Sequence, residues 1–437
     1  MACVADGAEG LSLPCTSAGR ARRGRSRQQS RYTTLRSDSS LMSSEAASGP
    51  SRLATWMFER LLPRVQSGHL RLTLPNGQHL DLGRRDLGTD VTITVHRWRA
   101  LRRIGLTGEA GFSDGYIAGD WSTNNLVSVL DFLIRNETAF AGVASSRPAR
   151  LLDWLRHRAN ENTRTGSKKN IAAHYDLGNE FYRHWLDQGM NYSSAIYDSE
   201  LSLEAAQRNK LERVSRYLGL KGGERVLEIG CGWGSLAEHI IRGYDAAVTG
   251  VTLSRSQLDY ARKRLAAEIE AGKAAFLFQD YRDIVGRFDR IVSIEMFEAV
   301  GERYWPLYFE KLRSSLVKGG VAVLQIITIA PSRFDAYRAC PDFIQRHIFP
   351  GGMLPTAEIV EEHAANAMLT VTDRESFGLS YARTLRDWRD RFLGAWPEIE
   401  SLGFDTRFRR MWEYYLAYCE TGFRHSAIDV SIFKLTR

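Results

Sequence analysis

A chain of 437 residues with 43% hydrophobic residues is longer than one ordinary domain and predicts two packed domains plus a tail. Its five cysteines are scattered without paired spacing, which argues against a disulfide framework or a metal site and favours a reducing compartment. The net charge of +8 favours an anionic partner, either nucleic acid or an acidic lipid surface. No apolar run approaches the ~20 residues that cross a bilayer, so we expect a soluble or peripheral protein.

The composition of residues 1–50 predicts a disordered leader. The segment is rich in Ser, Ala, Gly and Arg, with seven arginines and no acidic residue between Arg20 and Arg36. Such a sequence cannot bury a core. An Arg- and Ser-rich, acid-poor leader is typical of organellar transit peptides. We favour the alternative that it is dispensable or a mis-called start, with the working protein beginning near Met42.

A small N-terminal domain is predicted over residues 51–140, followed by a polar, basic linker over 141–170. Alternating or β-rich runs, a Pro-Asn-Gly turn and an apolar helical stretch support a mixed α+β domain. The β-rich runs are residues 70–74 and 91–95, the turn is residues 75–77, and the helical stretch ends at Ile134. A basic cluster in this domain forms either a solvated face or a contact for lipid phosphates; it contains Arg97, Arg99, Arg102 and Arg103.

The second domain, residues 171–437, alternates strands and helices and predicts an α/β fold with a doubly wound, mostly parallel sheet. Ser254 and Gln257 have the spacing of a capping box that opens a helix, and Pro306 suits the first turn of another. Residues 330–355 form a proline-containing insertion. The expected strands are 225–229, 247–251, 275–279, 290–294, 320–328 and 428–435, and the last two helices are 383–400 and 405–422.

Polar residues at the ends of four strands predict a nucleotide-like cofactor, because ligands of open α/β sheets bind beyond the carboxyl ends of the strands. The first strand ends in Glu228 and a glycine turn, which lets backbone approach a ligand closely. The second strand lacks the acid that a dinucleotide site needs, which argues against NAD. S-adenosylmethionine fits better, since its sulfonium suits carboxylates and aromatic faces. The residues concerned are Glu228, Gly230, Gly232 and Gly234; Thr252 and Gln257; Asp280 and Tyr281; and Glu295–Glu298.

At this point the chain resembles the cyclopropane-fatty-acyl-phospholipid synthase family, which is S-adenosylmethionine-dependent. The match covers most of residues 70–437, and its blocks occur in order. They include His174–Asn179, Tyr192-Ser193, Val226–Gly234, Gly250–Ser254, Gln279–Asp283, Met296–Gly301, Ile348–Gly352, Ala395–Glu398 and Tyr414–Cys419. The resemblance implies a class I methyltransferase (Rossmann-like) catalytic domain and an N-terminal domain that engages lipid. It also implies that the enzyme acts on unsaturated phospholipid at the membrane surface, in the cytoplasm and peripherally at the inner membrane face, and it leaves a homodimer open.

The resemblance assigns roles to individual residues. The family's cofactor-binding positions fall on Tyr192, Ser193, Gly230, Gly232, Thr252, Gln257, Asp280 and Tyr281. A bound bicarbonate is the family's base, and Glu298 and Tyr381 match two of its holders. Cys419 falls on a cysteine often assigned as active, although a free cysteine is commonly a small buried hydrophobe. Aromatic residues are candidates for the walls that exclude water and stabilise a carbocation: Tyr304, Trp305, Phe343, Phe349 and Tyr381.

Two departures from the family pattern bear on the product. Ser194 stands where the family commonly has Cys, and it could still present its backbone N–H. Gln325 stands where the family has His, and it can donate a hydrogen bond to an anion but cannot carry a proton. We expect methyl transfer to an acyl double bond with cyclopropane formation. The alternative product, if deprotonation is impaired, is a methyl-branched or methyl-alkene chain.

Two further classes of function remain open from the sequence. The positive charge allows an RNA methyltransferase, but we find no RNA-binding module or base-activating motif. Gln325 allows a catalytically silent lipid-binding protein, but the intact glycine turn argues against it. We therefore expect no nucleic acid among the partners.

Overall fold

The computed structural model describes residues 65–140, 177–198 and 202–437. The expected leader, residues 1–50, and the expected linker, residues 141–170, lie outside the described residues. Two stretches of the predicted organisation can therefore be compared with the structure: most of the N-terminal domain and nearly all of the catalytic domain.

A small four-stranded sheet organises the N-terminal part, in the order β2-β1-β3-β4. The alternating residues of β1 and β3 bury their apolar side chains on one face, as a half-buried strand requires. The predicted turn is confirmed, since the Gly77 N–H donates to the Leu74 carbonyl at 2.9 Å. The elements are β1 (His69–Thr73), β2 (His79–Gly83), β3 (Asp90–Val95), α2 (Arg99–Thr107), α3 (Glu109–Ile117), β4 (Trp121–Ser122), α4 (Leu126–Arg135) and α5 (Glu137–Phe140).

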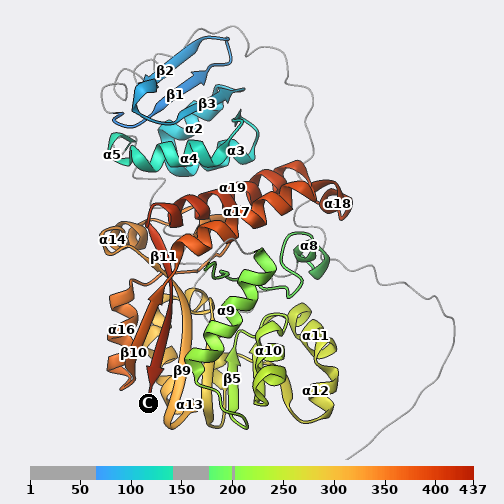
Figure 1. The fold of residues 1–437 in the computed structure, drawn as a ribbon. Helices are drawn as coiled ribbons and strands as arrows, with labels where there is room; N and C mark the ends of the chain where they lie inside the picture. Colours follow the sequence, from blue (N-terminus) through green and yellow to red (C-terminus); the bar gives the residue numbers. More distant parts are fainter. Residues whose placement is uncertain (1–64, 141–176, 199–201) are drawn as a thin grey trace, which may run out of the picture. The chain divides into compact units, whose positions relative to one another are not determined.

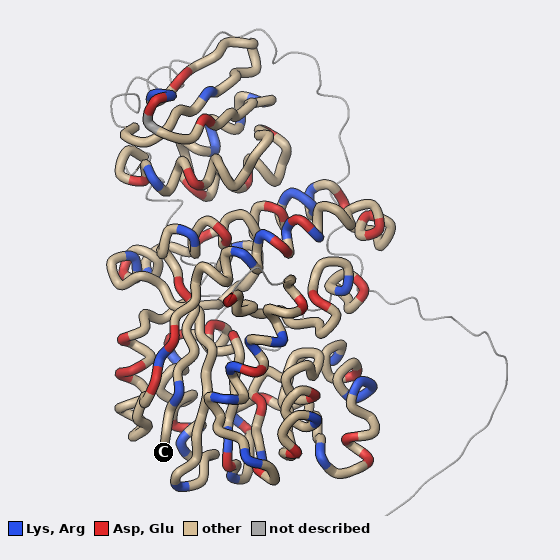
Figure 2. Tube along the Cα trace, viewed as in Figure 1, with Lys and Arg blue, Asp and Glu red and all other residues tan. Residues whose placement is uncertain are grey.

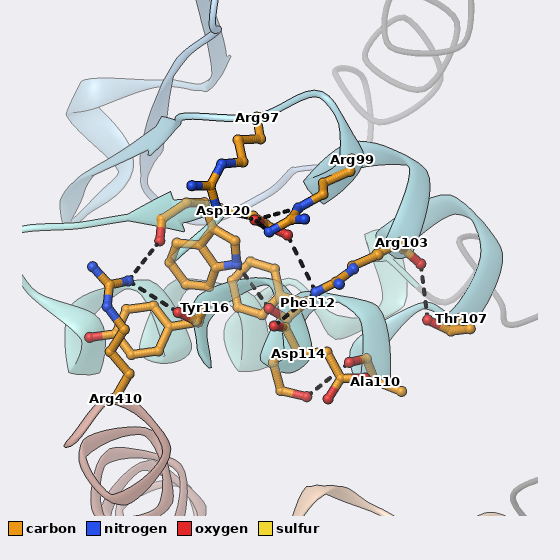
Figure 3. Close-up of polar contacts among 12 residues, drawn as sticks. Arg97, Arg99, Arg103, Thr107, Ala110, Phe112, Asp114, Tyr116, Asp120 and Arg410 are labelled. Atoms are coloured by element: carbon orange, nitrogen blue, oxygen red, sulfur yellow. Dashed lines mark hydrogen bonds and ion pairs between the residues drawn. The ribbon is translucent and has the colours of Figure 1, made fainter. Parts of the chain in front are cut away.

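Three arginines of the predicted basic cluster converge on one buried carboxylate, that of Asp120 (Figure 3). Arg97 and Arg99 contact Oδ1 at 3.2 and 2.7 Å, and Arg103 contacts Oδ2 at 3.3 Å. Asp120 is fully buried, whereas the three arginine side chains remain about half exposed. The cluster is thus neither a purely solvated face nor a set of free cations, and it keeps an excess of positive charge at the surface.

The catalytic part is built on a seven-stranded sheet in the order β10-β11-β9-β8-β5-β6-β7. Strands β9, β8, β5, β6 and β7 run parallel, while β10 and β11 are antiparallel to their neighbours. The predicted doubly wound, mostly parallel sheet is confirmed. The strands are β5 (Arg225–Ile229), β6 (Ala247–Thr252), β7 (Ala274–Phe278), β8 (Phe288–Ile294), β9 (Leu316–Ile329), β10 (Thr370–Ser376) and β11 (Ile428–Thr436).

Both faces of this sheet are covered by helices (Figure 1). Successive residues of one strand point to opposite faces, so Val226 packs with the layer of α9 and α10 while Leu227 packs with α13 and α16. Burial on both faces explains why these strands are continuous apolar runs. The helices are α8 (Asn179–Arg183), α9 (Leu203–Leu218), α10 (Ser235–Tyr244), α11 (Arg255–Arg264), α12 (Ala266–Glu270), α13 (Trp305–Ser315), α14 (Pro331–Ala339), α15 (Phe343–His347), α16 (Ala357–Asn366), α17 (Gly378–Gly394), α18 (Trp396–Ser401) and α19 (Thr406–Arg424).

Helix α19 links the catalytic part to the N-terminal part, because it packs against α17 on one side and against α3 and α4 on the other. Arg410 donates to the carbonyls of Tyr116 and Trp121 at 3.1 and 3.3 Å (Figure 3). The Tyr116 hydroxyl donates in return to Glu413 at 3.0 Å. These bonds join residues almost 300 positions apart and carry no signal in the local sequence.

The structure corrects two local predictions. Ser254 does cap α11, accepting from the Gln257 N–H, but the Gln257 side chain bonds Thr252 rather than the Ser254 N–H, so the capping box is only half formed. Strand β10 was missed because its exposed, polar sequence lacks an apolar alternation. Pro306 does lie in the first turn of α13. Within the described residues, no helix has the length and apolar character to cross a membrane.

Gly250 in β6 offers a test of the packing between the sheet and the glycine turn. A Cβ at this position would lie 2.7 Å from the Phe276 ring and 2.9 Å from the Cys231 Cβ. We expect Gly250→Ala to lower the free energy of unfolding by about 1–3 kcal/mol, measured by chemical denaturation. The control is Gly243→Ala in α10, where no atom lies within 4 Å, and it should leave stability unchanged or raise it by up to ~1 kcal/mol. Equal stability of the two variants would contradict this packing.

Candidate active site

A large cavity of about 1380 Å³, partly open to solvent, lies at the carboxyl ends of the parallel strands. Its wall includes the glycine turn after β5, the ends of β6 and β8, and residues of α19. The wall continues along apolar side chains of the N-terminal part, among them Leu72, Ile93 and Leu130. Pockets for single small ligands are commonly about 300–1000 Å³, so this cavity has room for a cofactor together with a second, apolar molecule.

The glycine turn presents open backbone to the cavity. Gly230 and Gly232 have φ values of +83° and +51°, in the left-handed region that favours glycine. A Cβ on Gly232 would meet no atom within 4 Å, so the space in front of it is free for a ligand. Gly234 begins helix α10 as its N-cap. The residues present therefore fit the close backbone approach expected for S-adenosylmethionine.

Glu228 and Lys210 form a buried polar centre beside this turn. One oxygen of Glu228 is buried without a hydrogen-bond partner, which suits a donor supplied by a cofactor. Burial raises the pKa of Glu228 to about 8, and the Lys210 charge opposes that shift. Burial also lowers the pKa of Lys210 to about 8. The Lys210 ammonium donates to the Ser193 hydroxyl at 2.8 Å and so positions a predicted cofactor residue. Sequence analysis missed Lys210, since a lone lysine in a helix carries no signal.

The other predicted cofactor residues lie around the same cavity. Thr252 donates to the Gln257 side chain at 3.1 Å, and both residues line the wall. The Tyr281 ring also lines it, with a buried hydroxyl that has no hydrogen-bond partner. Tyr192 lines it as well and shares a 2.9 Å hydroxyl bond with Tyr415.

Asp280 is the exception among the predicted cofactor residues, because its carboxylate is already engaged. Both of its oxygens accept hydrogen bonds from Arg282, at 2.8 and 2.7 Å, and the side chain is 4% exposed. This pair fixes the loop that carries Tyr281. The role of Asp280 in binding the cofactor stays a prediction.

The residues expected to hold a bicarbonate bond a side chain of the protein itself. Tyr381 and Gln325 were expected to face a bound bicarbonate, but both donate instead to Glu295, from the hydroxyl at 2.6 Å and from Nε2 at 2.7 Å. The Ser194 N–H also donates to Glu295, at 2.8 Å. Gln325 is fully buried and uses its donor on this carboxylate, so it does not present that donor to an anion. The residues present do not fit a separate bicarbonate.

Glu298 lies next to this arrangement, three residues after Glu295, and both line the cavity. One oxygen of Glu298 accepts from the Ile327 N–H at 2.5 Å, and the other is buried without a partner. Burial is the main cause that raises the pKa of Glu298 to about 8, and the negative charge of Glu295 is a smaller cause. Sequence analysis placed both residues at the end of a strand, and the family resemblance assigned a role to Glu298 alone.

Cys419 and several aromatic side chains complete the wall. Burial raises the pKa of the Cys419 thiol well above its usual value, so the thiol stays protonated and we assign it no catalytic role. Phe343, Phe349 and Tyr381 line the cavity as predicted. Trp305, by contrast, packs in the separate core cluster on the α13 side of the sheet. No group of three or more potential metal ligands occurs among the described residues.

Gly232 offers a test of where the cofactor lies. Gly232→Val would fill the open space before the turn, and we expect the affinity for S-adenosylmethionine, measured by calorimetry, to fall at least about 10-fold. Gly223→Val is the matched control, since Gly223 also has a positive φ and open surroundings but lies in the turn before β5. Unchanged affinity in Gly232→Val would refute this placement.

The burial of Glu298 predicts a pH-dependent stability. The unfolded state releases this proton near the ordinary pKa of 4.5, whereas the folded state keeps it up to about pH 8. The Glu298 contribution to the free energy of unfolding therefore falls as pH rises from 5 to 8, by at most about 1.4 kcal/mol per pH unit. We expect the unfolding temperature of Glu298→Gln, measured without ligand, to depend less on pH than that of the wild type. The exposed Glu310→Gln is the control, and identical pH profiles for all three proteins would contradict the assignment.

The chain matches known proteins over most of its length. The model of the mycolic acid cyclopropane synthetase family matches residues 162–433. The chain is 39% identical over 407 residues to the tuberculostearic acid methyltransferase UfaA1 of Mycobacterium tuberculosis, covering 89% of this chain and 93% of that protein. It is 36% identical over 339 residues to the cyclopropane-fatty-acyl-phospholipid synthase of Escherichia coli strain K12, covering 77% of this chain and 84% of that one.

A solved structure agrees with these relatives. The crystal structure of the mycolic acid cyclopropane synthase CmaA1, complexed with SAH and CTAB, is similar with a TM-score of 0.59 at 31% identity. The similarity covers 62% of this chain and 98% of that one. With the mostly parallel sheet and the glycine turn at its edge, these findings show a class I methyltransferase fold. The chain belongs to the mycolic acid cyclopropane synthetase family of S-adenosylmethionine-dependent lipid methyltransferases.

Proposed function

We propose that this enzyme transfers the methyl group of S-adenosylmethionine to the double bond of an unsaturated acyl chain of a phospholipid, and that the product is a cyclopropane. One observation carries the proposal. A single cavity joins the glycine turn and buried carboxylates of the sheet to an apolar wall built by the N-terminal part. A long hydrocarbon chain is the kind of molecule that such a wall accommodates.

The apolar wall also supports the chemistry. An alkene is a weak nucleophile, so it must be held about 3–3.5 Å from the methyl group in a fixed orientation. When bound at the glycine turn, S-adenosylmethionine supplies that methyl group on an electron-poor sulfonium. Attack by the alkene leaves a positive charge on the acyl chain, which water would quench. Phe349 and Tyr415 on the wall exclude water, and their ring faces stabilise a cation.

The surface of the N-terminal part supports a phospholipid as the carrier of the acyl chain. Three half-exposed guanidinium groups surround the single carboxylate of Asp120, so a phosphate would meet excess positive charge there. Helix α2, which carries two of these arginines, also contributes Leu101 and Ile104 to the cavity wall. A headgroup at the arginines and an acyl chain in the cavity would thus be held by the same helix, with the enzyme peripheral on the membrane.

An acyl chain with a methyl branch or a methylated alkene is the second candidate product. It is favoured by the similarity to a protein named as a tuberculostearic acid methyltransferase and by Gln325, which cannot relay a proton. We place the ring first because the cavity wall carries the carboxylate of Glu295, which can accept the proton whose loss closes the ring.

Mass spectrometry and NMR of lipid from vesicles of an unsaturated phospholipid, incubated with enzyme and S-adenosylmethionine, would separate these products. Addition of CH₂ without remaining alkene protons is the expected result. Addition of CH₂ with an alkene retained would show the methyl-alkene product. Addition of CH₄, which requires a reductant, would show the saturated branch.

RNA supplied in place of vesicles tests the remaining classes of function. Transfer of labelled methyl to RNA, or to neither substrate, would refute the proposal. We expect transfer to lipid alone. Basic and acidic residues are interspersed along the traces of α17 and α19 (Figure 2), whereas a continuous run of one sign typifies RNA-binding helices.

A further inference from the structure

Three hydrogen-bond donors hold the carboxylate of Glu295 in the cavity wall. Glu295 directly follows β8 and has a φ of +47°, a conformation that costs a non-glycine residue about 1–3 kcal/mol. Its two oxygens accept from the Ser194 N–H, the Gln325 amide and the Tyr381 hydroxyl, within 2.6–2.8 Å. The surrounding structure therefore holds this side chain in one orientation at the expense of backbone strain.

Two of the three donors are hidden from the cavity. Ser194 and Gln325 are fully buried, whereas Glu295 and its third donor, Tyr381, line the cavity. A separate anion would have to displace Glu295 to reach these donors, and two adjacent negative charges repel each other. The chain thus supplies its own carboxylate at the position where the resemblance to the cyclopropane synthases implies bicarbonate.

The hydrogen-bond donors and charges around Glu295 differ from those around Glu298. The three donors favour the ionised form of Glu295 and oppose the rise in pKa caused by its burial. The buried Lys210 ammonium adds a favourable positive charge. Glu298 has only a backbone donor, and the charge of Glu295 helps to raise its pKa. Burial raises the pKa of both glutamates, but only Glu295 has side-chain donors and a nearby ammonium that favour its ionised form.

We propose that Glu295 is the proton acceptor of the reaction and makes a bound bicarbonate unnecessary. The proposal rests on the proposed function. After methyl transfer, a C–H bond of the new methyl group breaks, its electron pair closes the ring onto the cationic carbon, and the proton passes to a carboxylate oxygen of Glu295. No oxidant or further reactant is needed. The strained backbone and the three donors keep that oxygen aimed at the acyl chain.

Removal of this side chain should create the anion site that the native chain lacks. Glu295→Gly suits the positive φ, so we expect this variant to fold, with its unfolding midpoint and its affinity for S-adenosylmethionine close to those of the wild type. Its turnover on unsaturated phospholipid vesicles should fall about 100-fold or more. Added bicarbonate or formate should restore at least about 10-fold, since a small carboxylate can occupy the vacated space and accept the proton.

Two matched proteins control for this rescue. The wild type should keep full activity in buffer freed of carbon dioxide, and bicarbonate should not stimulate it. Glu295→Gln should be inactive and not rescued, because its amide fills the same space without accepting a proton. If Glu295 had only a structural role, bicarbonate or formate would not rescue Glu295→Gly while leaving Glu295→Gln inactive.

The outcomes separate this inference from the proposed function. No methyl transfer from the wild type to lipid would refute the proposed function itself. If the wild type does methylate lipid, three results would overturn the role of Glu295: dependence of the wild type on bicarbonate, full activity of Glu295→Gly without an added anion, or failure of both bicarbonate and formate to rescue a folded Glu295→Gly that binds S-adenosylmethionine.

Discussion

The burial of charge at one edge of the sheet is the constraint on which the rest of the structure depends. Glu228, Glu295 and Glu298 lie at or just after strand ends, with Lys210 of α9 beside them. Glu228 and Lys210 are buried, and the two other glutamates are half-buried in the cavity wall. Such groups are stable only when paired, hydrogen-bonded or held neutral. Both faces of the sheet must therefore be sealed by helices, and the open edge must be covered as well. Helices α17 and α19 and the N-terminal part provide that cover.

This enclosure also suits the chemistry of the family. A dry cavity strengthens electrostatic interactions and protects a cation on a hydrocarbon chain. The N-terminal part contributes the apolar end of the cavity, while the glycine turn contributes the end for the cofactor. Under the proposed function, lipid binding and activation of the methyl group would share one space. The bonds from Arg410 and Glu413 to the N-terminal part hold its two ends together.

The replacement of an exogenous base by a side chain would change how the enzyme responds to its surroundings. An anion from solution must be bound and desolvated before each turnover, whereas Glu295 is permanently oriented by its three donors. The positive φ of Glu295 is the kind of backbone strain that clusters at functional sites. Gln325 then has a defined part as a donor to Glu295, so its inability to carry a proton is no defect.

The sequence by itself determined the sheet, the glycine turn and the family. The periodicity of apolar residues, the spacing of glycines and the helix caps are local signals. Strands β5, β6 and β8 and the turn at Gly230–Gly234 could therefore be predicted to within a few residues. Only the tertiary structure decided that Glu295 receives the donors of Ser194, Gln325 and Tyr381. Those residues are separated by up to 187 positions between Ser194 and Tyr381 (381 minus 194), and local sequence does not record which side chains meet across such distances. The edge strand β10 escaped prediction for a related reason, because its residues pack on β11 through backbone bonds that any sequence can make.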